Sequence, residues 1–328
     1  MGEAIMARRG STLKITGQTE ETILFGETIN KYDPICLQII NTKLSNPATL
    51  PTGDATDVSF DSTRTYLAVA HVNSPYVTIY KRSGTTFTKL SDPNILPTGN
   101  AKSVIFDPTS TYLVVGHNNS PYITIYKRNE DTFTKLTNPS ILPPYEGNGL
   151  AFDSTSTYLV VCHYTSPYIT IYKRSGDTFT KLSDPTSLPP DTANTVTFDP
   201  TSTYLAVGHY TSPYITIYKR NEDTFTKLSN PTSLPTDVVN DVTFDLTSTY
   251  LSTAHFGSPY VTIYKRSGDT FTKLSNPDVL PTNTATGISF DPKSLCLVVA
   301  HSGTITEITT IYRRIGDTFE KITSFSLY

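Results

Sequence analysis

The six histidines are the residues whose type and spacing first suggest chemistry. They recur every 46 residues, and the set is His71, His117, His163, His209, His255 and His301. Histidine is a common zinc ligand, but two ligands of one zinc ion lie within about 4 Å of each other. Equivalent positions of separate repeats are too far apart for that. We therefore predict structural histidines whose ring nitrogens bond to backbone or Ser/Thr groups of the following turn, and no metal site.

The acidic and basic side chains show the same periodicity. An Asp follows each Phe of a repeated Phe-Asp pair, as at Asp61, and Lys-Arg pairs recur, as at Lys81-Arg82. We interpret the Asp residues as turn formers and the Lys-Arg pairs as solvated strand ends near acidic turns. Nucleophile-elbow, Walker, zinc-protease and dinucleotide-binding motifs do not occur. The sequence thus predicts no enzyme and no cofactor.

The repeat that carries these residues predicts the architecture. Phe60-Asp61 recurs five more times at the same 46-residue spacing, ending at Phe290-Asp291. Within one unit, residues 57–60, 66–71, 76–82 and 87–91 alternate in polarity and are separated by turn-rich segments. Four short strands in a repeat of this length are typical of a propeller blade. We predict an all-β fold, a β-propeller of four-stranded blades with six clear repeats.

Composition agrees with this fold and excludes several partners. The 328 residues include 21 Tyr and 15 Phe, and only 17% are charged, which favours strands. A net charge of −3 argues against nucleic-acid binding. We find no signal-peptide core and no apolar run long enough to insert in a membrane, so we expect synthesis in a cytoplasm. The three cysteines, at unrelated spacings, are expected to be free and mostly buried.

The number of blades is left open by the N-terminal segment. Residues 43–47 match the end of a blade's fourth strand, one period before Lys89-Leu90, but residues 11–40 match none of the Phe-Asp, His or Ser-Pro-Tyr positions. One division is an N-terminal β module at 1–44 followed by a six-bladed propeller at 45–328. The alternative is seven blades, with residues 11–44 as a degenerate blade.

Positions where the repeats disagree are the best candidates for a binding site, because the scaffold does not require them. They fall in the turn after each His and in the connection between successive units, two loops that open on the same face of a propeller. Aromatic residues beside carboxylates and amides suit a sugar-binding or protein-binding surface. The candidate ligand-binding residues are Tyr145, Glu146, Tyr164, Asp191, Tyr210, Asp237, Asn240, Asp241 and Phe256. The groups expected nearer the channel mouth are scattered and have no His among them: Asp54, Asp57, Lys102 and Asp241.

Two resemblances add to this reading. Tyr-Leu-Ala-Val at 66–69 and Ile-Thr-Ile-Tyr at 123–126 resemble WD-repeat and YVTN-type propellers, although the chain has no Trp. Tyrosines occupy the place of that Trp, where we expect them to fill the space between blades and to bond through their hydroxyls: Tyr80, Tyr126, Tyr172, Tyr218 and Tyr264. The full repeat across 57–322 is similar to repeats of tailed-bacteriophage and prophage structural proteins, and residues 12–40 resemble a β module that begins phage fibre and decoration proteins.

The phage resemblance implies a non-enzymatic virion structural protein, in a decoration, fibre or tail role, that displays its propeller for surface or host binding. Its implied partners are other virion proteins, through the N-terminal module, and a host-surface glycan or protein. The implied location is the virion, after synthesis in the bacterial host cytoplasm. A general protein-interaction scaffold remains an alternative, and a propeller lactonase or glycosidase a weaker one.

Overall fold

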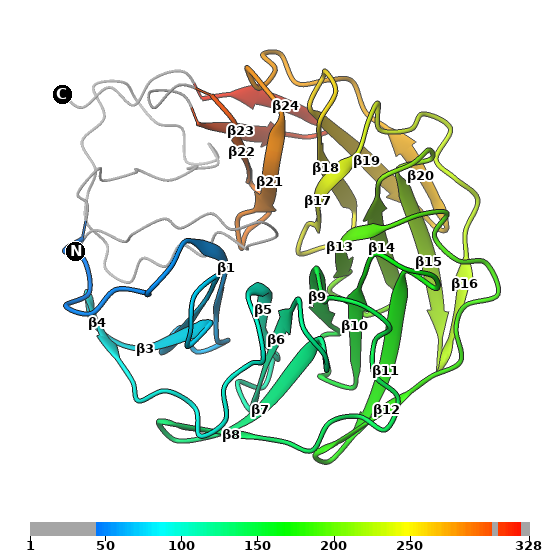
Figure 1. The fold of residues 1–328 in the computed structure, drawn as a ribbon. Coiled ribbons are helices and arrows are strands. Elements are labelled where there is room, and N and C mark those ends of the chain that lie inside the picture. The colour runs from blue at the N-terminus through cyan, green and yellow to red at the C-terminus, as the bar shows by residue number, and fades with distance from the viewer. Residues whose placement is uncertain (1–43, 304–307, 323–328) are drawn as a thin grey trace.

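The computed structural model describes residues 44–303 and 308–322. They form six antiparallel four-stranded sheets, each built from four consecutive strands and arranged as the blades of a propeller (Figure 1). Blade 1 comprises strands β1–β4, blade 2 β5–β8, blade 3 β9–β12, blade 4 β13–β16, blade 5 β17–β20 and blade 6 β21–β24. The predicted all-β propeller with six 46-residue repeats is confirmed. The predicted N-terminal module or degenerate blade lies outside the described residues.

The strand bounds follow the repeat closely. The inner strands are β1 (Ala55–Phe60), β5 (Ala101–Phe106), β9 (Gly149–Phe152), β13 (Ala193–Phe198), β17 (Val239–Phe244) and β21 (Ala285–Phe290). The second strands are β2 (Tyr66–His71), β6 (Tyr112–His117), β10 (Tyr158–Cys162), β14 (Tyr204–His209), β18 (Tyr250–His255) and β22 (Cys296–His301). The third strands are β3 (Val77–Ser83), β7 (Ile123–Asn129), β11 (Ile169–Ser175), β15 (Ile215–Asn221), β19 (Val261–Ser267) and β23 (Thr309–Ile315). The outer strands are β4 (Thr86–Lys89), β8 (Thr132–Lys135), β12 (Thr178–Lys181), β16 (Thr224–Lys227), β20 (Thr270–Lys273) and β24 (Thr318–Lys321).

The core lies between blades rather than within them. The second strands are buried along both faces, which is why they read as nearly continuous apolar runs such as YLVVGH in β6. Side chains of blade 1, including Ile79, pack with Leu113 and Phe133 of blade 2 in a single cluster. The tyrosine expected in place of a Trp is fully buried there, and Tyr126 Oη donates to the carbonyl of Ile95 at 2.8 Å. That prediction is confirmed.

The ring nitrogens of the histidines bond to Thr and backbone groups, as predicted, although the threonines lie on the third strand rather than in the following turn. Each Nε2 lies within hydrogen-bond distance of a threonine hydroxyl on the third strand, for example 3.0 Å between His209 and Thr216 Oγ1. In blades 3 to 5, Nδ1 also lies near a backbone carbonyl of the following turn, such as Thr211 O at 2.8 Å. Burial lowers the pKa of His209 from 6.5 to about 4, so the ring is neutral near pH 7. Among the described residues, no group of three His, Cys, Asp or Glu side chains is placed to hold a metal ion.

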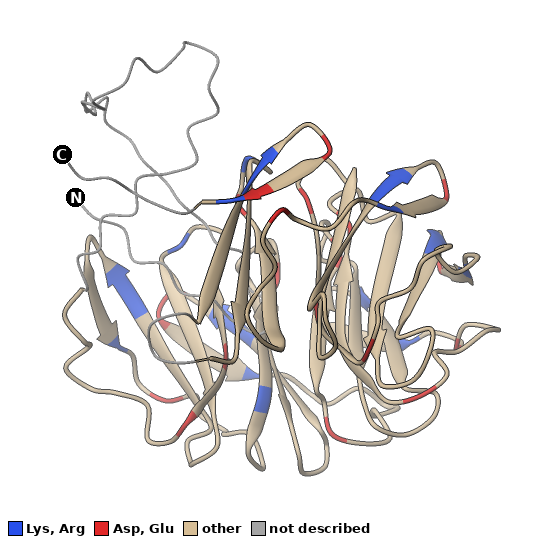
Figure 2. Cartoon of the chain, turned by 90° about the horizontal axis from the view of Figure 1, so that it is seen from above, with Lys and Arg blue, Asp and Glu red and all other residues tan. Residues whose placement is uncertain are grey.

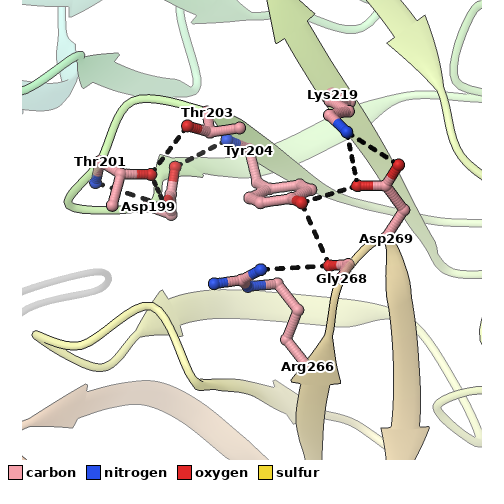
Figure 3. A network of polar contacts seen from close by, with 8 residues as sticks. All are labelled: Asp199, Thr201, Thr203, Tyr204, Lys219, Arg266, Gly268 and Asp269. Atoms are coloured by element: carbon pink, nitrogen blue, oxygen red, sulfur yellow. Dashed lines mark hydrogen bonds and ion pairs between the residues drawn. The ribbon is translucent and has the colours of Figure 1, made fainter.

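Polar links join neighbouring blades on the side of the hairpins between third and outer strands (Figure 3). Tyr204 Oη of blade 4 donates to Asp269 of blade 5 at 2.7 Å, and Lys219 Nζ pairs with the same carboxylate at 2.9 Å. Arg266 lies over the Tyr204 ring, with its guanidinium carbon 4.7 Å from the ring centre. Asp199 accepts from the Tyr204 amide at 2.6 Å, so the Asp after each Phe does form a turn. The predicted contacts between lysines and acidic turns are confirmed.

Figure 2 shows segments with Lys and Arg interspersed with segments that carry Asp and Glu. Each inter-blade link joins one lysine to one aspartate, which accounts for much of this mixing. In the part of the chain that the structure describes, no helix is long and apolar enough to cross a membrane.

One cysteine prediction was wrong. Cys162 is a fully buried free thiol, as expected, and burial raises its pKa. Cys296, in contrast, is disulfide-bonded. It takes the place that Tyr66 holds in blade 1. The odd number of cysteines and their unrelated spacings therefore did not exclude a disulfide bond.

Candidate functional site

The two loops that vary between repeats do open on one face. The side chain of Asn119, in the turn between β6 and β7, donates to Thr98 O of the connection into blade 2 at 3.0 Å. The same contact joins Asn73 to Thr52 in blade 1. A side chain at Gly99 would collide with Asn118 and Asn119, with a Cβ only 2.3 Å from Asn118 Oδ1. A large residue at this position of the connection would therefore displace the turn asparagines of blades 1 and 2.

Blade 3 is built differently at the same place. Its connection carries Tyr145 where blades 1 and 2 have Gly53 and Gly99, and its turn carries Tyr164 in place of Asn118. The Tyr145 and Tyr164 rings meet edge to face, with centroids 6.0 Å apart and planes at 90°. Tyr145 also stacks on Tyr122 of blade 2 at 6.0 Å and 22°. We call these three residues the tyrosine cluster.

The tyrosine cluster is exposed enough to bind a ligand. Tyr145 is 43% and Tyr164 39% exposed, although their rings contact each other. Offset-stacked and edge-to-face pairs are the favoured aromatic geometries, so the cluster is held in place before any ligand arrives. Tyr122 was missed from the sequence, because it belongs to the periodic Ser-Pro-Tyr motif and was treated as scaffold.

The inner strands line a pocket whose Lys102 contacts the connection that carries Tyr145. This pocket of about 350 Å³ is lined by side chains of the inner strands of blades 1 to 5, among them Lys102, Asn148, Asn194 and Asn240. Lys102 Nζ lies 3.8 Å from Glu146 Oε2, and Glu146 directly follows Tyr145 in the chain.

Asn148, just before β9, lacks the side-chain hydrogen bond that asparagines at the same repeat position make. Asn240 Nδ2 donates to the Ala285 carbonyl of the next blade at 2.9 Å, and Asn194 makes the equivalent contact at 3.4 Å. Asn148 holds the same repeat position, but its buried Nδ2 has no hydrogen-bond partner among the described residues. An unpaired buried donor costs about 1–3 kcal/mol, which a ligand or water oxygen would recover.

The remaining predicted site residues divide into two groups. Tyr210 (42% exposed) and Phe256 (52% exposed) lie on the same face but join no described ring pair. Asp191 and Asp237 each accept the amide of the next residue at 2.7 Å, which makes them loop formers. The structure therefore brings Tyr145, Glu146 and Tyr164 together and leaves these four apart.

The predicted residues on β17 are buried. Asp241 is fully buried and accepts the amides of Val242 and Ile288 at 2.9 and 2.8 Å. Asn240 is 3% exposed and bonded to the next blade. Asp57 repeats the Asp241 arrangement in blade 1, where it accepts the amide of Val104 at 2.9 Å. These carboxylates hold adjacent inner strands together, and their geometry gives no support to a ligand-binding role.

Comparisons with known proteins agree on the fold. No family model and no curated protein matches the chain. A protein from Lactobacillus plantarum has 14% sequence identity and a TM-score of 0.64, with 82% of this chain and 84% of that one covered. A putative 6-phosphogluconolactonase from Bacteroides uniformis gives 12%, 0.66, 85% and 86% in the same order. Hydrazine synthase from Kuenenia stuttgartiensis gives 12%, 0.60, 82% and 80%. Such low identities show a shared propeller fold and nothing of activity, and none of the three names refers to a virion.

Proposed function

We propose that this propeller is a non-enzymatic binding protein of a phage surface, and that the tyrosine cluster with the adjacent Lys102–Glu146 pair binds a host-envelope glycan. The observation that carries the proposal is the cluster itself, three packed rings from two blades beside the Lys102–Glu146 pair. Sugar rings stack on exposed aromatic faces, and nearby charged and amide groups can bond to their hydroxyls. The virion origin rests on the sequence resemblance alone.

The contacts of the titratable groups near the pocket support the non-enzymatic part of this proposal. The carboxylates nearest the channel, Asp57 and Asp241, accept backbone amides and serve as structural groups. The buried histidines contact threonines of their own blades, for instance His117 with Thr124, so they are poorly placed to transfer protons to a ligand. Lys102 and Glu146 are the remaining charged pair near the pocket, and two groups neutralising each other make a weak catalytic set.

The test is a binding and turnover screen with the full-length protein. Purified lipopolysaccharide, teichoic acid and peptidoglycan fragments are immobilised, and a parallel assay follows hydrolysis of 6-phosphogluconolactone and a panel of aryl glycosides. We expect retention on at least one envelope glycan and no hydrolysis above the buffer rate. Hydrolysis would favour the lactonase or glycosidase alternative. Binding only to a host protein would favour the interaction-scaffold alternative.

A further inference from the structure

The junction between blade 6 and blade 1 differs from the other five junctions. We call it the seam. Each of the five pairs of consecutive blades shares one apolar cluster with side chains from both partners. At the seam the cluster of Leu67, Val69 and Tyr80 contains residues of blade 1 alone. Inner strands of consecutive blades also pack together, from β1 with β5 to β17 with β21, but no comparable packing joins β21 to β1 among the described residues (Figure 1).

The residues that form the polar link at the other junctions are replaced on both sides of the seam. In the five other junctions a Tyr and a Lys of one blade bond to an Asp of the next, as Tyr250 and Lys265 do to Asp317. Blade 6 carries Cys296 and Arg313 in place of that Tyr and Lys. Blade 1 carries Thr85 in place of the Asp. Five junctions keep all three residues and one junction lacks them all, so this polar link cannot join blade 6 to blade 1.

Both faces of the seam are nevertheless apolar and less buried than their equivalents. On blade 1, Val58, Phe60 and Phe87 are partly buried and pack on the cluster of Leu67, Val69 and Tyr80. The ring equivalent to Phe87 in blade 2, Phe133, is buried against Tyr66 of the preceding blade at 6.2 Å. On blade 6, Ile311 is half-buried, whereas its equivalent Ile263 is 2% exposed. Apolar faces that are left less buried in this way mark a docking surface.

The described chain enters blade 1 from the seam side. Tyr80 Oη donates to Thr49 O at 2.9 Å, just as Tyr126 donates to Ile95 O in the connection from blade 1 to blade 2. Residues 44–54 therefore follow the course of an inter-blade connection. Leu44 is the repeat equivalent of Leu90, which follows an outer strand and packs between blades 1 and 2. Residue 44 thus stands where the outer strand of a preceding blade would end.

We propose that residues 1–43 dock in the seam and complete the ring. Leu44 continues this segment at the position that Leu90 holds after an outer strand, so the segment reaches the seam face of blade 1 without a long linker. Cys296 on the blade 6 face is disulfide-bonded and Cys162 is a free thiol. The one other cysteine of the sequence, Cys36, lies within this segment. The proposal goes beyond the glycan-binding function, since the tyrosine cluster lies on blades 2 and 3.

The experiment is a cleavage of the full-length chain at its junction with the propeller. A recognition site for a specific protease is inserted between Lys43 and Leu44, and the cleaved protein is passed over a sizing column in reducing buffer, so that no disulfide retains the segment. Mass spectrometry then identifies what elutes with residues 44–328. We expect the 1–43 segment to co-elute with a propeller of monomer size.

Two substitutions in the cleavable protein make the test specific. Phe87→Asp places a charge on the blade 1 seam face and should release the segment, lowering the co-eluting fraction at least tenfold. Ile95→Asp is the matched control, because Ile95 is 53% exposed on a connection away from the seam, and it should leave the segment bound. Free elution of the segment from the cleaved parent would overturn the proposal. So would a dimer of 44–328, which would make a second copy the occupant. Equal release by both substitutions would also overturn it, because binding would then not depend on the seam face.

Discussion

The buried histidines predict that this fold loses stability in mild acid. Burial lowers the pKa of four of them to about 4, namely His117, His163, His209 and His255, whereas in the unfolded chain a histidine titrates near 6.5. The folded state therefore binds fewer protons than the unfolded state between these values. Stability is fully present above pH 6.5 and is lost as the pH falls toward 4, because only the unfolded chain gains the protons.

The size of the effect follows from the same values. Between pH 7 and pH 5 each of the four histidines should remove about 2 kcal/mol from the free energy of unfolding. The four together should remove about 7 kcal/mol, comparable with the entire stability of a typical domain at about 5–15 kcal/mol. The aspartates of the inter-blade links do not contribute to the loss of stability between pH 7 and pH 5. Their pKa values are lowered from 3.8 by the lysine and tyrosine partners, so their contribution is lost only below that pH.

The assay is urea unfolding at half-unit steps from pH 7 to pH 5, followed by far-ultraviolet circular dichroism because the chain has no Trp. His209→Gln is the informative variant. It should be less stable at pH 7, but its loss between pH 7 and pH 5 should be about 2 kcal/mol smaller than that of the parent. In parallel, NMR of the histidine ring protons should show the four rings untitrated at pH 5. A stability that does not change with pH, or ring protons that titrate near 6.5, would refute the reasoning.

Two further predictions concern packing. Tyr204→Phe removes the hydroxyl that bonds to Asp269 and should cost about 1–2 kcal/mol in urea unfolding. Lys219→Met removes a solvent-exposed ion pair with the same aspartate and should cost less than the tyrosine substitution. A larger loss for the lysine would contradict the assignment of the link to the tyrosine. Cys162 should resist alkylation by iodoacetamide at pH 8 in the folded protein and react after unfolding. The reason is that its thiol is fully buried and its pKa is raised. Modification at the same rate in both states would contradict this prediction and show that the interior opens readily.

Much of the fold could be predicted from the sequence because each unit repeats one physical pattern. Phe-Asp, His and Ser-Pro-Tyr mark the same three turns in successive units, so an error in one unit is corrected by the others. The His–Thr contacts and the buried tyrosines were accessible for the same reason. The seam was not, since it is defined by what is missing at Thr85 and Cys296, and a single substitution at either position looks like ordinary drift.

The candidate site could be predicted only in part. Tyr145, Glu146 and Tyr164 were found because they depart from the repeat. Asp241 was included for the same reason, but its departure serves the inner strands, where its carboxylate accepts two backbone amides. Asn148 keeps the residue type of its equivalents and loses only the hydrogen bond. No sequence pattern reports a missing bond, so that feature required coordinates.

The measurement that tests the proposed binding face most directly is a comparison of two variants in equilibrium binding to the glycan that the screen retains. Tyr145→Gly gives blade 3 the residue that blades 1 and 2 already carry, while Tyr210→Ala removes a ring of similar exposure, at the repeat position of Tyr164, outside the tyrosine cluster. We predict a roughly 5- to 30-fold rise in Kd for Tyr145→Gly, or about 1–2 kcal/mol, and less than about a twofold change for Tyr210→Ala, with both variants as stable as the parent. Equal affinity of the two variants would contradict the account.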